Sequence, residues 1–413
     1  MLLNKPYDNL HKIENSFPDL YGDVDYGFQK ERYAHAFSKF KNIYNVNAAY
    51  IASSSGRIEI CGNHTDHNGG KALVATVNLD TIAFFLPTND NLVSVTSEGY
   101  KEFKVDLSKD YKEKQGTSSA LVYGVSKALK DAGYRIGGFN AYITSNVPSG
   151  AGISSSAAFE LLICEILNFL YNQEKISAED KAKFSQFAEN VYFGKPCGLL
   201  DQTAISFGGL NMLDFHDEKH IAVTGVNDNL SDYTFVLINT GGSHANLTGE
   251  YAAIPNEMRQ VAKCFNENRL IDVSETEFYS SANNLNVSDR AINRAIHFYE
   301  ENTRVKNCFD ALIKKDYALF LKQINDSGVS SLCKLQNCYV AGAIEQPIPK
   351  ALFITSKFFK DGANRVHGGG FAGTILNIVK NSEYKDFVAK CDVIFGKENV
   401  IPLKIRRVGT KTL

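Results

Sequence analysis

A short run of small residues between a predicted strand and a predicted helix constrains this chain more than any other feature. The run Gly150-Ala151-Gly152-Ile153-Ser154-Ser155-Ser156 follows the alternating segment 139–143, which is typical of a strand. Residues 148–150 are typical of a break after that strand. Apolar residues then recur near one helical face, at Ala158, Leu162, Ile166, Phe169 and Leu170. Because the first N–H groups of a helix and its dipole favour anions, the run predicts a phosphate site.

The same run also has a simpler interpretation. Gly150 and Gly152 would let the backbone come close to a ligand, and the hydroxyls of Ser154–Ser156 can bind phosphate oxygens or a metal ion. No Gly-Lys-Ser/Thr sequence follows the glycines, so this is not a Walker loop, and it is not the dinucleotide pattern either. A serine-rich helix cap without a ligand fits equally well, and only other motifs can separate the two interpretations.

Length and composition narrow the class of protein. A chain of 413 residues with 44% hydrophobic and 22% charged residues is typical of a soluble globular protein with two domains or one large one. Its net charge of -2 gives no electrostatic basis for binding nucleic acid, and no apolar run has the length of a membrane span. The first residues lack the apolar core of a signal peptide, and the eight cysteines form no paired C-x-x-C sets. We therefore expect reduced thiols, a cytoplasmic location, and neither a nucleic-acid nor a membrane partner.

A second polar loop follows an alternating strand. Residues 57–61 place Ile58 and Ile60 on one face and the two charged residues, Arg57 and Glu59, on the other. We expect the preceding run 53–56 to break this strand from a shorter one at 50–52. The loop 62–70 contains three glycines and many polar side chains before the next apolar strand at 72–77, which predicts hydrogen bonding to a polar ligand. Cys61, His64 and His67 have the spacing of part of a zinc site, but a structural zinc needs four ligands and no second cluster follows, so zinc is disfavoured.

Three further positions stay open on the residues alone. Glu189 lies between core positions of a predicted helix, where a glutamate is normally a surface residue. Asp201 lies in an apolar segment bounded by glycine and proline, so it is either a helix cap or a carboxylate placed for proton or charge chemistry. Gly368-Gly369-Gly370 precedes a predicted strand at 374–379, which indicates a close backbone approach to another loop or to a ligand.

Acidic and asparagine residues cluster near 212–232, where we expect a boundary between a domain of residues 1–215 and one of residues 216–413. A ligand would then bind between the two domains. The aromatic residues of the first fifty positions have helical spacing, and we expect them in the core, at Phe28, Tyr33, Phe37, Phe40 and Tyr44.

Taken in this order, the motifs resemble the GHMP kinase superfamily, and within it the galactokinase family most closely. Residues 56–70 look like its sugar-binding motif and residues 147–158 like its ATP phosphate loop. Residues 197–202 resemble its catalytic segment, and 367–373 match its third glycine loop. The resemblance implies an α/β (α+β) fold of two domains, an N-terminal domain like ribosomal protein S5 and a ferredoxin-like C-terminal domain.

The resemblance also implies a reaction and roles for residues. It implies an ATP-dependent sugar 1-kinase that makes galactose 1-phosphate and ADP, uses Mg²⁺, takes a small-molecule sugar substrate and is a monomer. Asp201 and Arg57 would be catalytic and flank the C1 hydroxyl of the sugar, and Ser156 and Glu189 would hold the metal ion. The sugar would be bound by Asn63, His64, Asp66, His67, Gly198 and Tyr251. The ATP phosphates would be bound by Gly150, Ala151, Gly152, Ser154, Ser155 and Ser156, with Gly368, Gly369 and Gly370 as the third loop.

Some positions depart from the family pattern. Asn63 stands where galactokinases usually have a glutamate that holds the C6 hydroxyl, His67 stands where they have tyrosine, and residues 252–255 replace a usual Asn and Arg pair. An amide removes a negative charge beside C6, and a C6 carboxylate could accept hydrogen bonds from Asn63 and from a protonated His67. Galacturonate is therefore the alternative substrate, and N-acetylgalactosamine stays open.

The sequence disfavours two other classes of protein. A sugar- and ATP-binding regulator without activity is disfavoured, because the serine-rich loop, Glu189, Asp201 and Arg57 are all intact. A kinase for mevalonate or homoserine is disfavoured by the polar loop 64–70, which suits a polyhydroxylated ligand.

Overall fold

The structure is a computed structural model that describes the chain except for residues 1–4, 23, 112–113, 149, 228–229 and 242–246, so Ser149 of the predicted phosphate loop lies outside the described residues. The strands are β1 (Tyr50–Cys61), β2 (Lys71–Pro87), β3 (Leu92–Ser97), β4 (Phe103–Asp106), β5 (Phe139–Ser145), β6 (Leu210–Asp214), β7 (Ala222–Val226), β8 (Tyr233–Asn239), β9 (Gly362–Val366), β10 (Thr374–Lys380), β11 (Val400–Leu403) and β12 (Lys411–Thr412). The α-helices are α1 (Phe17–Tyr21), α2 (Gly27–Tyr44), α3 (Ser118–Asp131), α4 (Ser155–Asn172), α5 (Ala178–Phe187), α6 (Leu200–Phe207), α7 (Thr248–Lys263), α8 (Glu275–Ser281), α9 (Asp289–Ile313), α10 (Tyr317–Ser330), α11 (Pro347–Thr355) and α12 (Tyr384–Phe395).

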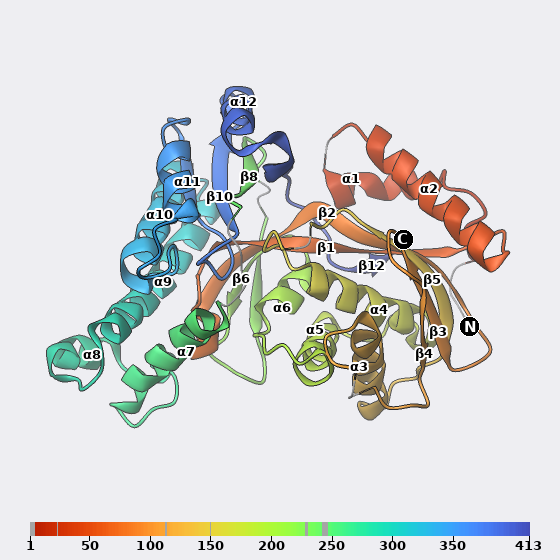
Figure 1. Ribbon diagram of the computed structural model, residues 1–413, viewed down its shortest axis with the longest axis horizontal. Coiled ribbons are helices and arrows are strands. Elements are labelled where there is room, and N and C mark those ends of the chain that lie inside the picture. Colours follow the sequence, from red (N-terminus) through yellow and green to blue (C-terminus); the bar gives the residue numbers. More distant parts are fainter. Residues whose placement is uncertain (1–4, 23, 112–113, 149, 228–229, 242–246) are drawn as a thin grey trace.

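An eight-stranded sheet carries the first half of the chain. Its strands follow the order β12-β1-β2-β5-β3-β4, with β6 paired to β2 and β7 paired to β6. Helices α1 and α2 lie on one face of the sheet and α3 to α6 on the other (Figure 1). Successive residues of β2 serve the two faces, since Phe84 packs with the α1–α2 aromatics and Phe85 with α3 and α4. The sheet is therefore buried on both sides.

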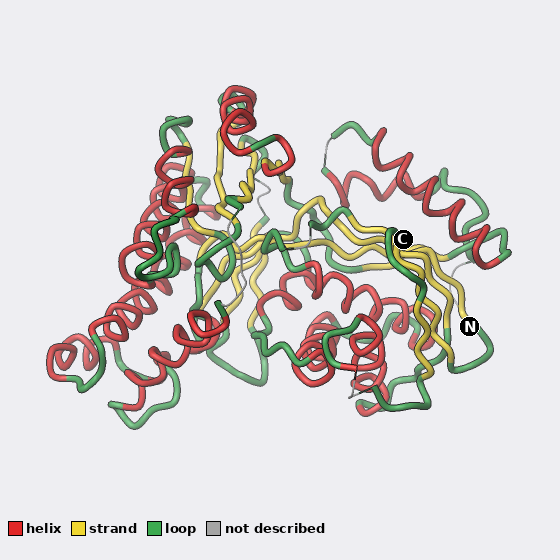
Figure 2. The backbone as a smooth tube through the Cα atoms, viewed as in Figure 1, coloured by secondary structure: helices red, strands yellow, loops and turns green. Residues whose placement is uncertain are grey.

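A smaller antiparallel sheet, ordered β11-β8-β10-β9, forms the centre of the second half. Phe235 and Leu237 of β8 pack against α9 and α10, while Val236 and Ile238 pack against α11 and α12. Figure 2 shows these strands and their helices at one end of the molecule, with the larger sheet at the other. The alternation of β8 thus joins two helical layers through one sheet.

Segments from the second half of the chain join the larger sheet. Strand β7 pairs with β6, Ile405 forms a bridge with Val77, and β12 pairs with β1 at Ala52 and Thr412. Residues on the C-terminal side of the expected boundary therefore complete the larger sheet, and the division into 1–215 and 216–413 stays a prediction.

The strand–loop–helix prediction around residue 150 is confirmed by β5 and α4. The predicted break at 53–56 is wrong, because β1 continues through it with one register shift. Ser53 Oγ donates to Asp80 Oδ2 over 2.5 Å and Ser54 Oγ lies 2.8 Å from Thr410 Oγ1, so these two buried hydroxyls have partners, whereas Ser55 Oγ has none among the described residues.

Strand β2 likewise continues well beyond the strand predicted at 72–77. The expected aromatic core of α2 is confirmed for Tyr33, Phe37 and Phe40 and is wrong for Phe28, which is 63% exposed. Within the described ranges, no helix is both long and apolar enough to cross a bilayer.

Candidate active site

A polar cavity of about 170 Å³ lies where β1, the loop after it, the start of α6 and the third glycine loop meet. We call it the polar pocket. It is lined by Arg57, Glu59, Asn63, His64, Asp66, His67, Cys197, Gly198, Leu200, Asp201, Gly368 and Gly369. The fold therefore brings together three of the four segments that the sequence singled out.

Arg57 and Asp201 form an ion pair at one end of the polar pocket. Arg57 Nε and Nη2 donate to Asp201 Oδ1 over 2.8 Å and 2.6 Å, and Arg57 Nη1 donates to the carbonyl oxygen of Gly152. The Arg57 side chain is buried, while 34% of the Asp201 side chain is exposed to the cavity. A fixed guanidinium thus holds a carboxylate whose remaining surface faces the pocket.

The electrostatics favour an ionised Asp201. Burial on its own would raise the pKa of this carboxyl group, but the charge of Arg57 and the hydrogen bonds from Ser154 and Arg57 outweigh burial and lower the pKa below its ordinary value. Asp201 is therefore an anion at neutral pH. It can accept a hydrogen bond from a hydroxyl group in the pocket.

Ser154 connects this pair to the helix that the sequence run predicted. It precedes α4 with a left-handed backbone, φ 62°, and makes no side-chain cap hydrogen bond. Its hydroxyl instead donates to Asp201 Oδ2. The next two residues, Ser155 and Ser156, line a different cavity. The predicted role of Ser154 toward phosphate stays a prediction. In the fold, its hydroxyl holds Asp201.

Asn63 is committed to the protein rather than to the cavity. Its Nδ2 donates to Glu59 Oε1 and to the carbonyl oxygen of Gly368, each over 2.9 Å. Its Oδ1 accepts from Asn337 Nδ2 over 2.7 Å, and only 1% of the residue is exposed. A primary amide has two N–H groups, so no donor of Asn63 is left for a ligand.

His64 takes a left-handed backbone, φ 56°, and its Nε2 lies 2.9 Å from the carbonyl oxygen of Gly369. Burial, together with the nearby His67, lowers the pKa of His64 to about 3, so the ring is neutral. Since a carbonyl oxygen can only accept, Nε2 carries the proton.

Glu59 is a pocket residue that the sequence prediction missed. Its Oε1 accepts from Asn63 and, over 3.2 Å, from Arg365 Nη1. Its Oε2 has no hydrogen-bond partner among the described residues. Burial raises the pKa of Glu59, while Arg365 and Arg57 oppose that rise. The signal was available, because the alternation of the strand puts Glu59 on the face of Arg57.

Of the other predicted sugar residues, Asp66, His67 and Gly198 line the polar pocket and Tyr251 does not. His67 Nε2 lies 3.4 Å from Asp66 Oδ1, and the carboxylate of Asp66 lies so close to Gly198 that a Cβ there would collide with it. Tyr251 is not among the residues that line the polar pocket as described, and its hydroxyl donates to the carbonyl oxygen of Gly370 over 2.8 Å. Tyr251 therefore supports the third glycine loop through this hydrogen bond.

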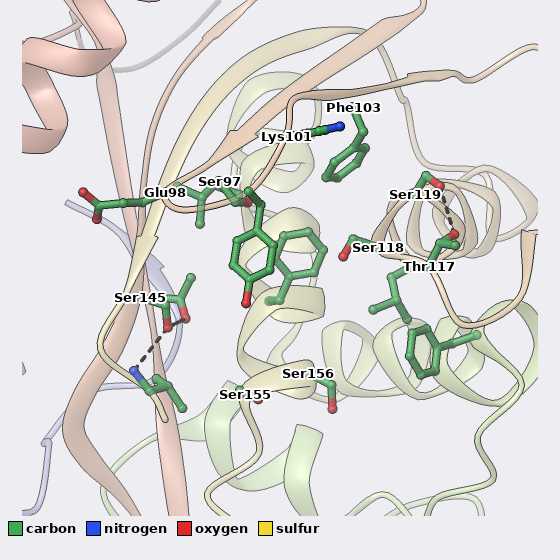
Figure 3. A pocket seen from close by; sticks show the side chains of 17 residues that line it. Ser97, Glu98, Lys101, Phe103, Thr117, Ser118, Ser119, Ser145, Ser155 and Ser156 are labelled. Atoms are coloured by element: carbon green, nitrogen blue, oxygen red, sulfur yellow. Dashed lines mark hydrogen bonds between the residues drawn. The ribbon is translucent and has the colours of Figure 1, made fainter. Parts of the chain in front are cut away.

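A larger cavity, of about 730 Å³, lies on the other side of the serine run. We call it the large pocket. Figure 3 shows Ser155 and Ser156 at one end and Lys101 and Phe103 at the other. Further hydroxyls come from Thr117, Ser118 and Ser119 at the start of α3, and Phe159 adds a second aromatic ring. A cavity of this volume with aromatic walls and a helix N-terminus suits a flat ring joined to an anion.

Ser156 and Glu189 meet beside the large pocket. Glu189 is 2% exposed, which differs from the surface position that a helical glutamate usually takes. Its Oε1 accepts from Ser156 Oγ and from Lys195 Nζ, each over 3.0 Å, and its Oε2 accepts from Gln202 Nε2 over 2.8 Å. Lys195 was missed, because nothing in the sequence separates it from a surface lysine.

The pair of hard oxygens from Ser156 and Glu189 fits Mg²⁺. No group of three or more His, Cys, Asp or Glu side chains able to hold a metal occurs in the described part of the chain. An ion here would take its remaining ligands from phosphate oxygens and water.

Two family models match the chain. The model of the GHMP kinases N terminal domain matches residues 97–209, and the galactokinase galactose-binding signature matches residues 38–87. The first range contains the serine run and Asp201, and the second contains β1 and the loop after it.

Curated relatives match over most of their length. A galactokinase of Clostridium tetani (strain Massachusetts / E88) is 30% identical over 87% of this chain and 91% of its own. A galactokinase of Clostridium beijerinckii is 33% identical over 86% and 91%. Among solved structures, Lactococcus lactis galactokinase complexed with galactose has a TM-score of 0.81 at 24% identity and covers 92% of this chain and 100% of its own. The mevalonate kinase of Methanococcus jannaschii has a TM-score of 0.62 at 16% identity, over 86% and 98%. These two likenesses support the fold.

Proposed function

The chain belongs to the galactokinase family of GHMP kinases, and on this premise we propose that it transfers the γ-phosphoryl group of ATP to the C1 hydroxyl of galactose, giving galactose 1-phosphate and ADP. One observation carries the assignment of roles. Three successive serines join the two cavities, since Ser154 holds Asp201 in the polar pocket while Ser155 and Ser156 line the large pocket. A sugar hydroxyl beside Asp201 would therefore lie next to a phosphate at the start of α4.

In this proposal Asp201 accepts a hydrogen bond from the C1 hydroxyl and aims its oxygen at the γ-phosphorus. The proton passes to Asp201 as the new O–P bond forms, and Arg57 offsets the negative charge that develops. Because the pKa of Asp201 is lowered, it is a weak base, and orientation is its larger contribution. This agrees with phosphoryl transfer through a loose transition state, in which positioning and charge dominate.

The large pocket would hold ATP, with the base near Phe103 and Phe159 and the phosphates at Ser155 and Ser156. Ser156 and Glu189 would hold a magnesium ion, whose charge would offset that of the phosphates. Lys195, paired with Glu189, would add a second positive charge at this edge. The proposal also includes a monomer in the cytoplasm.

The polar pocket favours a neutral sugar over galacturonate. Of the two residues on which the galacturonate alternative rests, Asn63 donates both N–H groups to the protein, so only His67 could reach a C6 carboxylate, and the neighbouring His64 is neutral. The galactokinase of L. lactis was solved with galactose, which supports the neutral hexose for this chain.

A coupled assay of ATP consumption tests the proposal with galactose, galacturonate, N-acetylgalactosamine and glucose. We expect turnover with galactose, and a loss of about 10²- to 10⁴-fold in kcat for Asp201→Asn, which removes the charged oxygen that orients the C1 hydroxyl and takes its proton. Asp131→Asn is the matched control, because Asp131 is an exposed carboxylate paired with Lys127 on α3. Sugar binding without ADP formation would favour the regulator instead, and turnover of galacturonate alone would favour the uronate kinase.

A further inference from the structure

We infer that Glu59 determines substrate specificity: its carboxylate accepts a hydrogen bond from a sugar hydroxyl remote from the reacting one, and so restricts the polar pocket to neutral hexoses. The inference rests on the proposed function, because it names the substrate class of the same pocket. Neither the sequence motifs nor the family comparisons assign a role to this residue.

The position of Glu59 on β1 sets which end of a sugar it would meet. Arg57 and Glu59 lie on one face of the strand and both line the polar pocket. Residues two apart on a strand are separated by about 6.6 Å. If Arg57 and Asp201 mark the reacting C1 hydroxyl, Glu59 lies across the ring from it. In a hexopyranose that side carries the C4 hydroxyl and the exocyclic C6 hydroxyl.

The free oxygen of Glu59 requires a donor. Oε1 is taken by Asn63 and Arg365, whereas Oε2 has no partner in the described ranges. Burial raises the pKa of Glu59, while the charges of Arg365 and Arg57 favour the ionised form. In that form the carboxylate can only accept hydrogen bonds, so a bound sugar must present an O–H group to Oε2 or leave a charged oxygen desolvated. The two hydrogen bonds to Oε1 also hold the carboxylate in one orientation. The group therefore cannot turn to suit a different substrate, which favours discrimination between substrates.

The surroundings of Glu59 do not offer a binding site for an anion. Arg365 is fully buried behind it, and its Nη1 is used by Glu59. The Nε and Nη2 atoms of Arg365 are also buried and, among the described residues, unpaired, so they do not reach a ligand in the pocket. A uronate carboxylate at this end would therefore face the carboxylate of Glu59, and neither Asn63 nor Arg365 would offer it an accessible donor.

The wild-type enzyme gives the first test, through kcat/KM for galactose, 4-deoxygalactose, 6-deoxygalactose and galacturonate. We expect a loss of at least about tenfold for the deoxy sugar that lacks the partner hydroxyl, and of at least about 100-fold for galacturonate. If galactose is used but both deoxy sugars and galacturonate are used equally well, the role of Glu59 is refuted while the proposed function stands. If no sugar is phosphorylated, the proposed function itself fails.

The variant Glu59→Gln gives the second test. The amide oxygen can still accept from Asn63 and Arg365, while an NH₂ group replaces the free anion. We expect the deoxy sugar that the wild-type enzyme disfavours to reach the kcat/KM of galactose in this variant. The ratio of kcat/KM for galactose to that for galacturonate should fall at least about tenfold. The ratio of kcat/KM for two substrates, measured on one enzyme preparation, does not depend on the fraction of enzyme that is folded.

Glu165→Gln is the matched control for this variant. Glu165 is a buried carboxylate paired with Lys181 over 2.9 Å, and it lines neither pocket. We expect it to lower stability without moving the substrate ratio. An unchanged ratio in Glu59→Gln would overturn the inference, and if that variant does not fold, the deoxy-sugar series on the wild type decides.

Discussion

The charge of Asp201 depends on Arg57, and this dependence can be measured as a pH shift. Arg57→Gln removes the guanidinium that opposes burial, so the pKa of Asp201 rises. A proton acceptor must be ionised to act, and the acidic limb of kcat against pH therefore moves to higher pH. We also expect kcat to fall by about 10²- to 10³-fold, because one fixed positive charge is lost. Initial rates between pH 4.5 and 8 check both effects.

Arg57→Lys separates charge from geometry in the same experiment. A lysine restores the positive charge, so the acidic limb should return toward its wild-type position. The rate should stay low, because an ammonium group cannot reproduce the three donors that reach Asp201 and Gly152. An unshifted limb in Arg57→Gln would mean that Arg57 does not set the pKa of Asp201.

Ser154 combines an unfavourable backbone with a useful hydroxyl, and two substitutions separate them. Ser154→Ala and Ser154→Gly both remove the donor to Asp201, so kcat should fall by a similar factor in the two variants. Only glycine relieves the left-handed backbone at φ 62°, so Ser154→Gly should be more stable than Ser154→Ala by about 1 kcal/mol. Urea unfolding and the ATP assay check this pair. Equal stability would indicate that the backbone is not strained here.

Single residues also show where sequence reasoning ends. The period-two pattern of β1 places Glu59 on the same face as Arg57. The sequence prediction nevertheless named Asn63 as a sugar-binding residue, because its identity differs from the family pattern. The structure shows that Asn63 is held by Glu59, Gly368 and Asn337, two of which lie about 270 to 300 positions away in the chain. Pairings over that distance leave no trace in local spacing, so the engaged amide could not be predicted.

At the scale of elements, helix α9 holds the loop 62–70 of the other half of the molecule. Glu301 is fully buried and accepts from the backbone N–H of Gly62 over 2.9 Å and from Ser327 and Arg304 over 2.5 Å and 2.6 Å. One turn earlier, His297 Nε2 lies 2.9 Å from the carbonyl oxygen of Asn63. The backbone of the loop is therefore fixed by a helix of the second half.

The variant Glu301→Gln tests this coupling. An amide offers one acceptor oxygen and turns its NH₂ group toward donors, so we expect a loss of about 2–4 kcal/mol in the free energy of unfolding. The KM for galactose should rise more than the KM for ATP, because the loop serves the polar pocket. Glu300→Gln is the control, since Glu300 is the neighbouring, partly exposed carboxylate paired with Lys334. Equal changes in both KM values would mean that the effect of Glu301 is not confined to the polar pocket.

The elements themselves were predictable to different degrees. The helix expected after the serine run is α4, because its apolar spacing is a local property. The continuity of β1 was not predictable, because Ser53 and Ser54 find partners in β2 and near the C-terminus, at Asp80 and Thr410. Serine favours turns when its hydroxyl bonds locally, and the sheet supplies a distant alternative.

Across the whole molecule, three buried histidines make stability depend on pH. Burial lowers the pKa of His64 to about 3, lowers that of His297, and places that of His367 well below its ordinary value of 6.5. Below pH 6.5 the unfolded chain binds protons at these positions while the folded chain does not, so stability falls as the pH falls. Glu160 acts in the opposite direction, because burial raises its pKa and the folded state holds the extra proton.

These groups together predict the slope of the pH dependence. Between pH 6.5 and 5.5 an unfolded histidine binds on average about three quarters of a proton, so three histidines opposed by Glu160, and in the same direction by Glu59, leave a difference of about one proton. That difference corresponds to a loss of about 1–2 kcal/mol per pH unit. Urea unfolding at pH 7.5, 6.5 and 5.5 measures that slope. His367→Asn should be less stable at pH 7.5 and show a shallower slope, whereas His220→Asn, at an exposed position, should keep the wild-type slope. A wild-type slope near zero would mean that these rings are protonated in the folded protein, which would put a positive charge beside the polar pocket and reopen the uronate substrate.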